Sequence, residues 1–314
     1  METTVRIYDF LLVTALLGAA WKTLFAREAF TSTVLFVAFG LLMAIVWTRL
    51  GAIDVALAEA CIGAGLTGAL LIDAIRHFQE DSNLNSKESR LTFHMAAGVL
   101  SLGLFSILST SLLNLQEPNK DVYTRVIDHM DVSGSSHPVT SVLLNFRAFD
   151  TWLELGVLLL ASFAAISIHQ LYDDGRGPDL MRPTPTAIKS LTRVMLPFLV
   201  IIGGFLLWLG SHSPGGAFQA GSLIGAAGIL IQITNPDRRI LFSSLGFRIL
   251  LSLGFLAFLA VAFLTNLLQG NFLEFPQSQA GTFILILELA ATASIALTLN
   301  VMFACSHPWT RGGR

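Results

Sequence analysis

Charged residues are scarce in this chain. Only 13% of its 314 residues are Asp, Glu, Lys or Arg, whereas soluble domains contain about 25%. The two cysteines, Cys61 and Cys305, lie in apolar runs, which argues against a disulfide framework and against a thiolate-held metal or iron–sulfur centre. A basic patch is missing, so nucleic acid is not an expected partner. Nucleophile–base pairs and phosphate loops are missing too, so we expect neither a catalytic centre nor a cofactor.

Apolar residues dominate instead. They make up 54% of the chain and give a mean hydropathy of +0.69, while 23 Phe and 26 Gly fit helices packed in lipid. A helix that crosses a bilayer needs about 20 mostly apolar residues. The chain is therefore predicted to be an all-α membrane protein with about nine transmembrane helices. These apolar runs cover residues 7–21, 29–48, 52–75, 91–113, 150–171, 194–210, 218–233, 247–266 and 281–303.

The positive charges predict an orientation. With nine crossings, five of the 19 Lys and Arg fall on one side of the membrane and the other fourteen on the opposite side. Because cytoplasmic loops are enriched in Lys and Arg, the N-terminus is expected outside and the C-terminus in the cytoplasm. The sixth and seventh runs are short and close together, which predicts either a tight hairpin or a re-entrant segment.

Two connections have distinct patterns. The longest, 116–146, is expected outside and contains an apolar stripe typical of a short helix on the membrane surface. That stripe consists of Val122, Val126, Ile127 and Met130. The stretch 172–190 is rich in Asp, Gly and Pro and is predicted to be a linker between domains.

Acidic residues within apolar runs are functional candidates, because charge inside a bilayer is costly. The third run contains Asp54 near its outer end and Glu59 five residues later, which places them about 140° apart around a helix. In the simpler interpretation Asp54 caps the helix and Glu59 pairs with a neighbouring helix. In the functional interpretation Glu59 relays a proton or a cation, because its own run contains no basic residue.

The fifth run begins with Arg147, Asp150, Thr151 and Glu154. Spacings of three and four place these residues along one helix face. One interpretation is an ion pair that fixes the helix at the membrane surface. The other is that Glu154 accepts protons, since Arg147 can neutralise one of the two acids but not both.

The ninth run contains Glu288 without a basic residue in the same run. If their helices adjoin, Glu59, Glu154 and Glu288 form an ion pathway open to the outside. His94 is a possible proton shuttle, because histidine changes charge near neutral pH. Like His169 and His212, however, it lacks metal-ligand spacing and is more typical of a helix contact.

The connection between the sixth and seventh runs combines a proline with glycines, which stop a helix and permit a tight turn. The free amide groups at the start of the next helix offer a site for an anion or for orienting a glutamine. The residues concerned are His212, Pro214, Gly215, Gly216 and Gln219.

Three of these segments resemble signatures of one family of membrane complexes. Gly51–Glu59 resembles the G-A-P-D-V-A-x-T-E-A signature of the D subunit of Mrp-like membrane-bound hydrogenases, which also occurs in the A subunit of Mrp-type sodium/proton antiporters. Arg147–Glu154 resembles the R-A-L-D-T-x-x-E segment of the neighbouring E subunit. Gly210–Gly221 resembles the G-H-x-S-P-G-G-G-F-Q-x-G signature of the antiporter B subunit. The sequence departs from these signatures at Ile53, Ala58 and Ala217.

The resemblance implies three modules: a D-like module at 1–80, an E-like module at 81–175 and a B-like module at 176–314. It further implies a non-catalytic subunit of a sodium/proton antiporter in a bacterial or archaeal cytoplasmic membrane. The implied partners are other Mrp-like subunits, including large antiporter-like ones, with Na⁺ and H⁺ as the ions. Asp54, Glu59, Asp150 and Glu154 are then residues near the ion path. A scaffold role, or a place in a redox-driven pump or an ion-driven uptake complex, remains the alternative.

Overall fold

The structure is a computed structural model that describes residues 2–78, 90–115, 120–172, 186–235 and 244–305, and the described part is helical without a strand. The long helices are α1 (Glu2–Phe25), α2 (Ala29–Arg49), α5 (Arg90–Leu113), α9 (Ala148–Tyr172), α10 (Thr186–Leu209), α11 (Ala217–Thr234), α12 (Leu245–Gln269) and α13 (Ala280–Cys305). The shorter ones are α3 (Ile53–Ala58), α4 (Thr67–Phe78), α6 (Lys120–Asp128), α7 (Met130–Ser133) and α8 (Pro138–Ser141). Two segments are π-helical, η1 (Glu59–Leu66) and η2 (Val142–Phe146).

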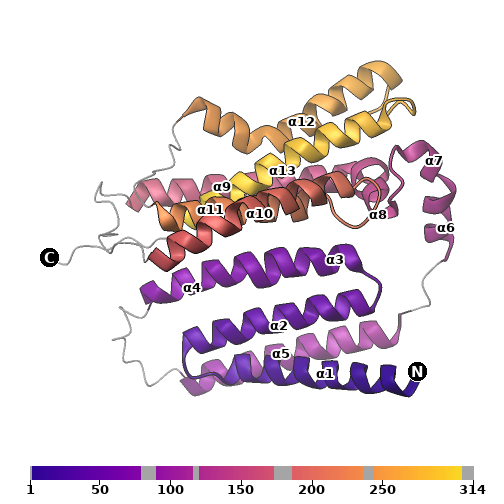
Figure 1. Cartoon of the computed structure of the whole chain (residues 1–314). Coiled ribbons are helices and arrows are strands. Elements are labelled where there is room, and N and C mark those ends of the chain that lie inside the picture. Colours follow the sequence, from indigo (N-terminus) through magenta and orange to yellow (C-terminus); the bar gives the residue numbers. More distant parts are fainter. Residues whose placement is uncertain (1, 79–89, 116–119, 173–185, 236–243, 306–314) are drawn as a thin grey trace.

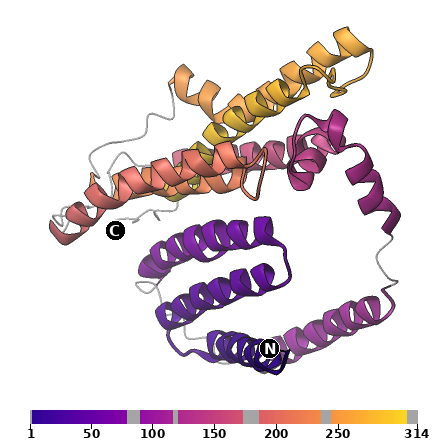
Figure 2. The ribbon, with the colours of Figure 1, turned by 45° about the vertical axis from the view of Figure 1, so that its right-hand side comes forward.

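The long helices form two groups whose axes run roughly alongside one another (Figure 1). One group contains α1 to α5, and the other contains α9 to α13, with α13 packed against α9, α11 and α12. A turned view shows the connection α6–α8 passing between the groups at one end of the molecule (Figure 2). The two groups also touch directly, because α3 and η1 contact α11.

The predicted all-α membrane architecture is confirmed. In the described part of the chain, eight uninterrupted helices are long and apolar enough to cross a membrane. The remaining predicted crossing, 52–75, is a composite of α3, η1 and α4. The sixth and seventh runs form a hairpin, because α10 and α11 are full-length helices packed on each other. The predicted linker was too long, since its last five residues already belong to α10; the orientation of the termini stays a prediction.

Helix α13 lies at the centre of the second group, and about two thirds of the residues in its apolar stretch are buried. Small residues on α11 allow α11 and α13 to approach each other closely. A Cβ atom at Gly221 would lie 2.8 Å from Cβ of Ile295, and one at Gly225 would lie 3.1 Å from Cδ1 of Leu299. The face of α11 that carries Gly221 and Gly225 is therefore the surface that packs on α13, as small residues do where membrane helices meet.

The described part of the long connection between α5 and α9, the α5–α9 connection, folds into α6, α7, α8 and η2. Helix α6 contains Val122, Val126 and Ile127 of the predicted apolar stripe, whereas Met130 belongs to α7. Gly134 follows α7 in a left-handed conformation, with φ +80°, and a Cβ atom there would lie 2.5 Å from the backbone N of Gly281. This connection is therefore docked on the start of α13.

Candidate functional site

Asp54 lies in the first turn of α3 and joins three parts of the chain. Its Oδ2 is 2.9 Å from Nε2 of His137, and its Oδ1 accepts a hydrogen bond from the N–H of Gly215 at 3.1 Å. Its backbone carbonyl accepts another from Nε2 of Gln219 at 3.3 Å. The sequence had suggested that Asp54 caps its own helix, but the N-cap is Ala52. We call these four residues, Asp54, His137, Gly215 and Gln219, the Asp54 cluster.

Serine side chains fix the segment that carries His137. Ser133 and Ser141 are fully buried, and their Oγ atoms are 2.9 Å apart. The backbone carbonyl of Ser211, in the α10–α11 turn, accepts hydrogen bonds from Oγ of Ser135 at 2.9 Å and from N of Ser136 at 3.0 Å. These hydrogen bonds hold the α5–α9 connection against the turn between α10 and α11.

That turn depends on glycine. Gly216 has φ +114° and ψ −169°, a combination that residues with a Cβ atom avoid. The N–H of Gly215 points at Asp54, so the anion predicted to bind at this turn is a carboxylate of the chain itself. His212 is exposed and stacks at a tilt on Trp208, with ring centroids 6.2 Å apart.

Glu288, on α13, lies against the same turn and is 1% exposed. In the described part of the chain, its carboxylate accepts one hydrogen bond, from Oγ of Ser211 to Oε2 at 3.5 Å. Its Oε1 faces glycines, because Cβ atoms at Gly210 and Gly216 would lie 3.0 and 3.3 Å from it. The burial predicted for Glu288 is therefore present, and the glycine turn covers its carboxylate.

Glu59 begins the π-helical segment η1. Its side chain folds back along the helix, so that a side chain at Gly63 would collide with Oε1 of Glu59. Thr67 ends the segment, with Oγ1 donating to the carbonyl of Ile62, five residues earlier, at 2.9 Å. Glu59 is half-buried and has no hydrogen bond or ion pair with the described residues. The expected pairing with a neighbouring helix is therefore not formed among the described residues, and π-helical turns are frequent at functional sites.

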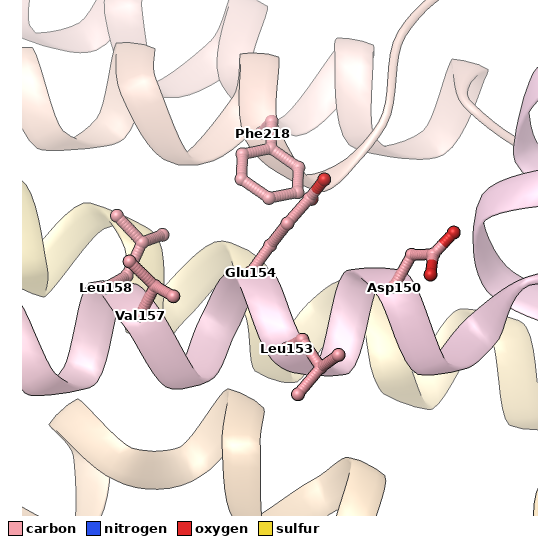
Figure 3. Close-up of a pocket in the computed structure, with 6 residues that line it drawn as sticks. All are labelled: Asp150, Leu153, Glu154, Val157, Leu158 and Phe218. Atoms are coloured by element: carbon pink, nitrogen blue, oxygen red, sulfur yellow. The ribbon is translucent and has the colours of Figure 1, made fainter.

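Asp150 and Glu154 line a shallow groove of about 570 Å³ on α9. Figure 3 shows the Glu154 side chain reaching toward Phe218 of α11, with Asp150 one turn away. Arg147 pairs with Asp150 and leaves Glu154 outside the ion pair. Thr151 is buried and donates to the carbonyl of Leu143 at 2.7 Å, which joins the start of α9 to η2.

The helices that carry the predicted acids meet around α11 and α13. Helix α11 contacts η1, which holds Glu59, and α13, which holds Glu288, while α9 with Glu154 packs on α13. Within the described part of the chain, no group of three His, Cys, Asp or Glu residues is close enough to hold a metal ion. His94 lies on α5, but its side chain is outside the described residues, so its role stays a prediction.

The sequence interpretation missed His137 and Ser211. The sequence did contain a signal for His137, because this histidine directly precedes a proline, and prolines are common in the first turn of a helix. Pro138 does occupy the first turn of α8. Ser211 carried no such signal, since its role depends on a carboxylate 77 residues away.

Two family models match the chain. The first, for the D subunit of MBH, matches residues 14–80. The second, "Domain related to MnhB subunit of Na+/H+ antiporter", matches residues 187–306. The intervening E-like module and the boundaries of the three modules stay predictions.

Known proteins resemble the chain over different lengths. The Na(+)/H(+) antiporter A subunit of Bacillus subtilis (strain 168) is 26% identical over 167 residues, which cover 52% of this chain and 20% of that protein. The Na(+)/H(+) antiporter A1 subunit of Staphylococcus aureus (strain JH9) is 25% identical over 170 residues, which cover 53% of this chain and 21% of that protein. The chain therefore spans about a fifth of the length of these curated relatives.

A solved structure shares the fold. A chain in the structure of the Mrp complex from Dietzia sp. DQ12-45-1b superposes with a TM-score of 0.72 at 20% identity, over 97% of this chain and 35% of that chain. The two family matches fall on the first and the last of the three segments whose motifs had suggested an Mrp-type subunit. The chain thus joins a segment similar to the D subunit of MBH to a domain related to the MnhB subunit of a Na+/H+ antiporter.

Proposed function

We propose that the chain is a membrane subunit of a multisubunit Na⁺/H⁺ antiporter and contributes protonatable side chains to the path of Na⁺ and H⁺. On this proposal it has no catalytic centre of its own. It lies in the cytoplasmic membrane of a bacterium or archaeon, with its N-terminus outside. Its partners are other Mrp-like subunits, including large antiporter-like ones. The similarity to antiporter A subunits and to an antiporter B-related domain supports this assignment.

The burial of Glu288 is the observation that carries the proposal. Its carboxylate is 1% exposed and receives a single long hydrogen bond within the described chain. A buried carboxylate is costly unless a proton, a cation or strong hydrogen bonds compensate it. A transported proton or sodium ion at Glu288 supplies that compensation, and the Asp54 cluster lies just across the glycine turn.

Neutral substitutions in the intact complex test the proposal. Asp54→Asn, Glu59→Gln, Asp150→Asn, Glu154→Gln and Glu288→Gln are compared in everted membrane vesicles, where a pH-sensitive dye follows proton release on addition of Na⁺. Co-purification of the other Mrp-like subunits with the tagged chain verifies assembly. We expect Glu288→Gln to abolish antiport in an assembled complex.

The matched control is Glu274→Gln, because Glu274 is an exposed carboxylate in the loop before α13 and contacts Asn271 instead of the Asp54 cluster. It should transport at the parental rate. Parental transport by all five assembled variants would contradict the proposal and leave the chain as a scaffold.

A redox-driven ion pump is a second candidate, because the first module matches the family model for the D subunit of MBH. Iron–sulfur proteins in the purified complex would favour the pump. A complex without them that exchanges Na⁺ for H⁺ would favour the antiporter.

A further inference from the structure

His137 is a titratable side chain that the three family-like motifs do not include. Its Nε2 lies 2.9 Å from Oδ2 of Asp54, and the two side chains are 12% and 17% exposed. We infer that His137 is a proton-relay residue, which passes protons between water at this end of the bundle and the carboxylate of Asp54. This inference rests on the proposed antiporter function and adds a residue to its proton path.

The two ring nitrogens of His137 have different surroundings. Nε2 is engaged by Asp54, whereas none of the described residues forms a hydrogen bond with Nδ1. A proton taken from water at Nδ1 produces an imidazolium ion. The proton on Nε2 then passes to Oδ2 of Asp54, which leaves a neutral imidazole and a neutral carboxylic acid. Histidine suits this step because it changes charge near neutral pH.

The backbone around His137 is held in place, as a relay requires. Its N–H donates to Oγ of Ser135 at 3.2 Å, and its carbonyl accepts from Oγ of Ser141 at 3.1 Å. Pro138 follows it in the first turn of α8 and restricts the backbone further. The imidazole is therefore positioned against Asp54 before any proton arrives, which favours transfer.

Other charged groups do not take over this role in the described part of the chain. Asp54 forms an ion pair there with His137 and with no lysine or arginine. Arg49, at the end of the neighbouring α2, is bound by Asp9. From α11 the neutral Gln219 faces Asp54, and from α13 Glu288 reaches the turn through Ser211. Among the described residues, His137 is thus the basic side chain in contact with the carboxylate of Asp54.

The test replaces the imidazole in the intact complex. His137→Gln retains a hydrogen-bond donor but cannot titrate, and Na⁺/H⁺ exchange is measured in everted vesicles from pH 6 to pH 9. Because a positioned acid–base group typically contributes about a hundredfold or more, we expect antiport to fall by about tenfold or more, with a changed pH profile. The control is His129→Gln, since His129 lies on the same α5–α9 connection and its ring is hydrogen-bonded to the carbonyl of Arg125. It should keep the parental rate and pH profile.

A double variant tests whether His137 acts through Asp54. If it does, Asp54→Asn with His137→Gln transports no worse than Asp54→Asn alone, since two residues of one relay are not additive. An assembled His137→Gln complex with the parental rate and pH profile overturns the relay. So does failure of both His137→Gln and His137→Asn to co-purify with the other Mrp-like subunits, which assigns the imidazole to holding the segments together. If Glu288→Gln still abolishes antiport in either case, the proposed function stands without the relay.

Discussion

Replacing Glu288 with leucine is expected to stabilise the assembled protein while abolishing transport. The carboxylate is 1% exposed, among buried residues of α13 such as Leu287 and Ala291, and the hydrogen bond from Ser211 is long, at 3.5 Å. Replacing buried ionic groups by apolar residues of similar volume is neutral or stabilising by about 1–4 kcal/mol. Leucine has one heavy atom fewer, but its methyl groups are bulkier than carboxylate oxygens, and fitting them costs about 1 kcal/mol. The free energy of unfolding of the assembled protein is therefore expected to rise by about 0–3 kcal/mol.

The assay heats the purified complex in mild detergent in steps and measures the intact fraction by size exclusion. Transport is measured in vesicles from the same cells. Glu154→Leu is the matched control, because Glu154 is an exposed acid on the neighbouring α9, and its replacement should change thermal stability little. A Glu288→Leu complex that is less stable than the parent by more than about 1 kcal/mol would refute the reasoning, because the carboxylate would then be structural.

Two further substitutions test the packing around the site with the same heating series. Asp54→Ala removes the acceptor of the Gly215 N–H and the partner of His137, and it should cost about 2–4 kcal/mol. Asp54→Asn keeps an acceptor for Gly215 and should cost less, so equal losses would contradict the observed bonds. Gly221→Ala places a Cβ atom 2.8 Å from Cβ of Ile295 and should destabilise by about 1–3 kcal/mol. Gly204→Ala meets no atom within 4 Å and should be neutral or stabilising, so identical melting of the two glycine variants would disprove the close α11–α13 contact.

The interruption of the third crossing shows a limit of reading apolar runs. The run at 52–75 predicted one helix, because hydropathy depends on composition and not on backbone hydrogen bonding. The structure inserts η1 between α3 and α4, and the i−5 bond of Thr67 to Ile62 marks its end. Such a local change in the hydrogen-bond register leaves the hydropathy of the run unchanged.

The acids illustrate a second limit. Their positions in apolar runs identified Glu59, Glu154 and Glu288 as candidates, because charge within lipid is costly wherever the helices pack. Spacing along one helix also placed Arg147 beside Asp150, and the ion pair confirms it. It could not identify the partner of Asp54, since His137 is 83 residues away and lies outside the apolar stripe of its connection.

The sequence by itself located the apolar runs, the hairpin glycines and the motifs of the D-like and B-like segments, because these depend on local composition and short motifs. Only the tertiary structure decided that α3, the α5–α9 connection and the α10–α11 turn meet at Asp54, and that the same turn covers Glu288. The physical reason is that these contacts join residues far apart in the sequence: Ser211 and Glu288 are separated by 77 positions and Asp54 and Gly215 by 161. Their geometry is set by how the helices pack, which no single segment specifies.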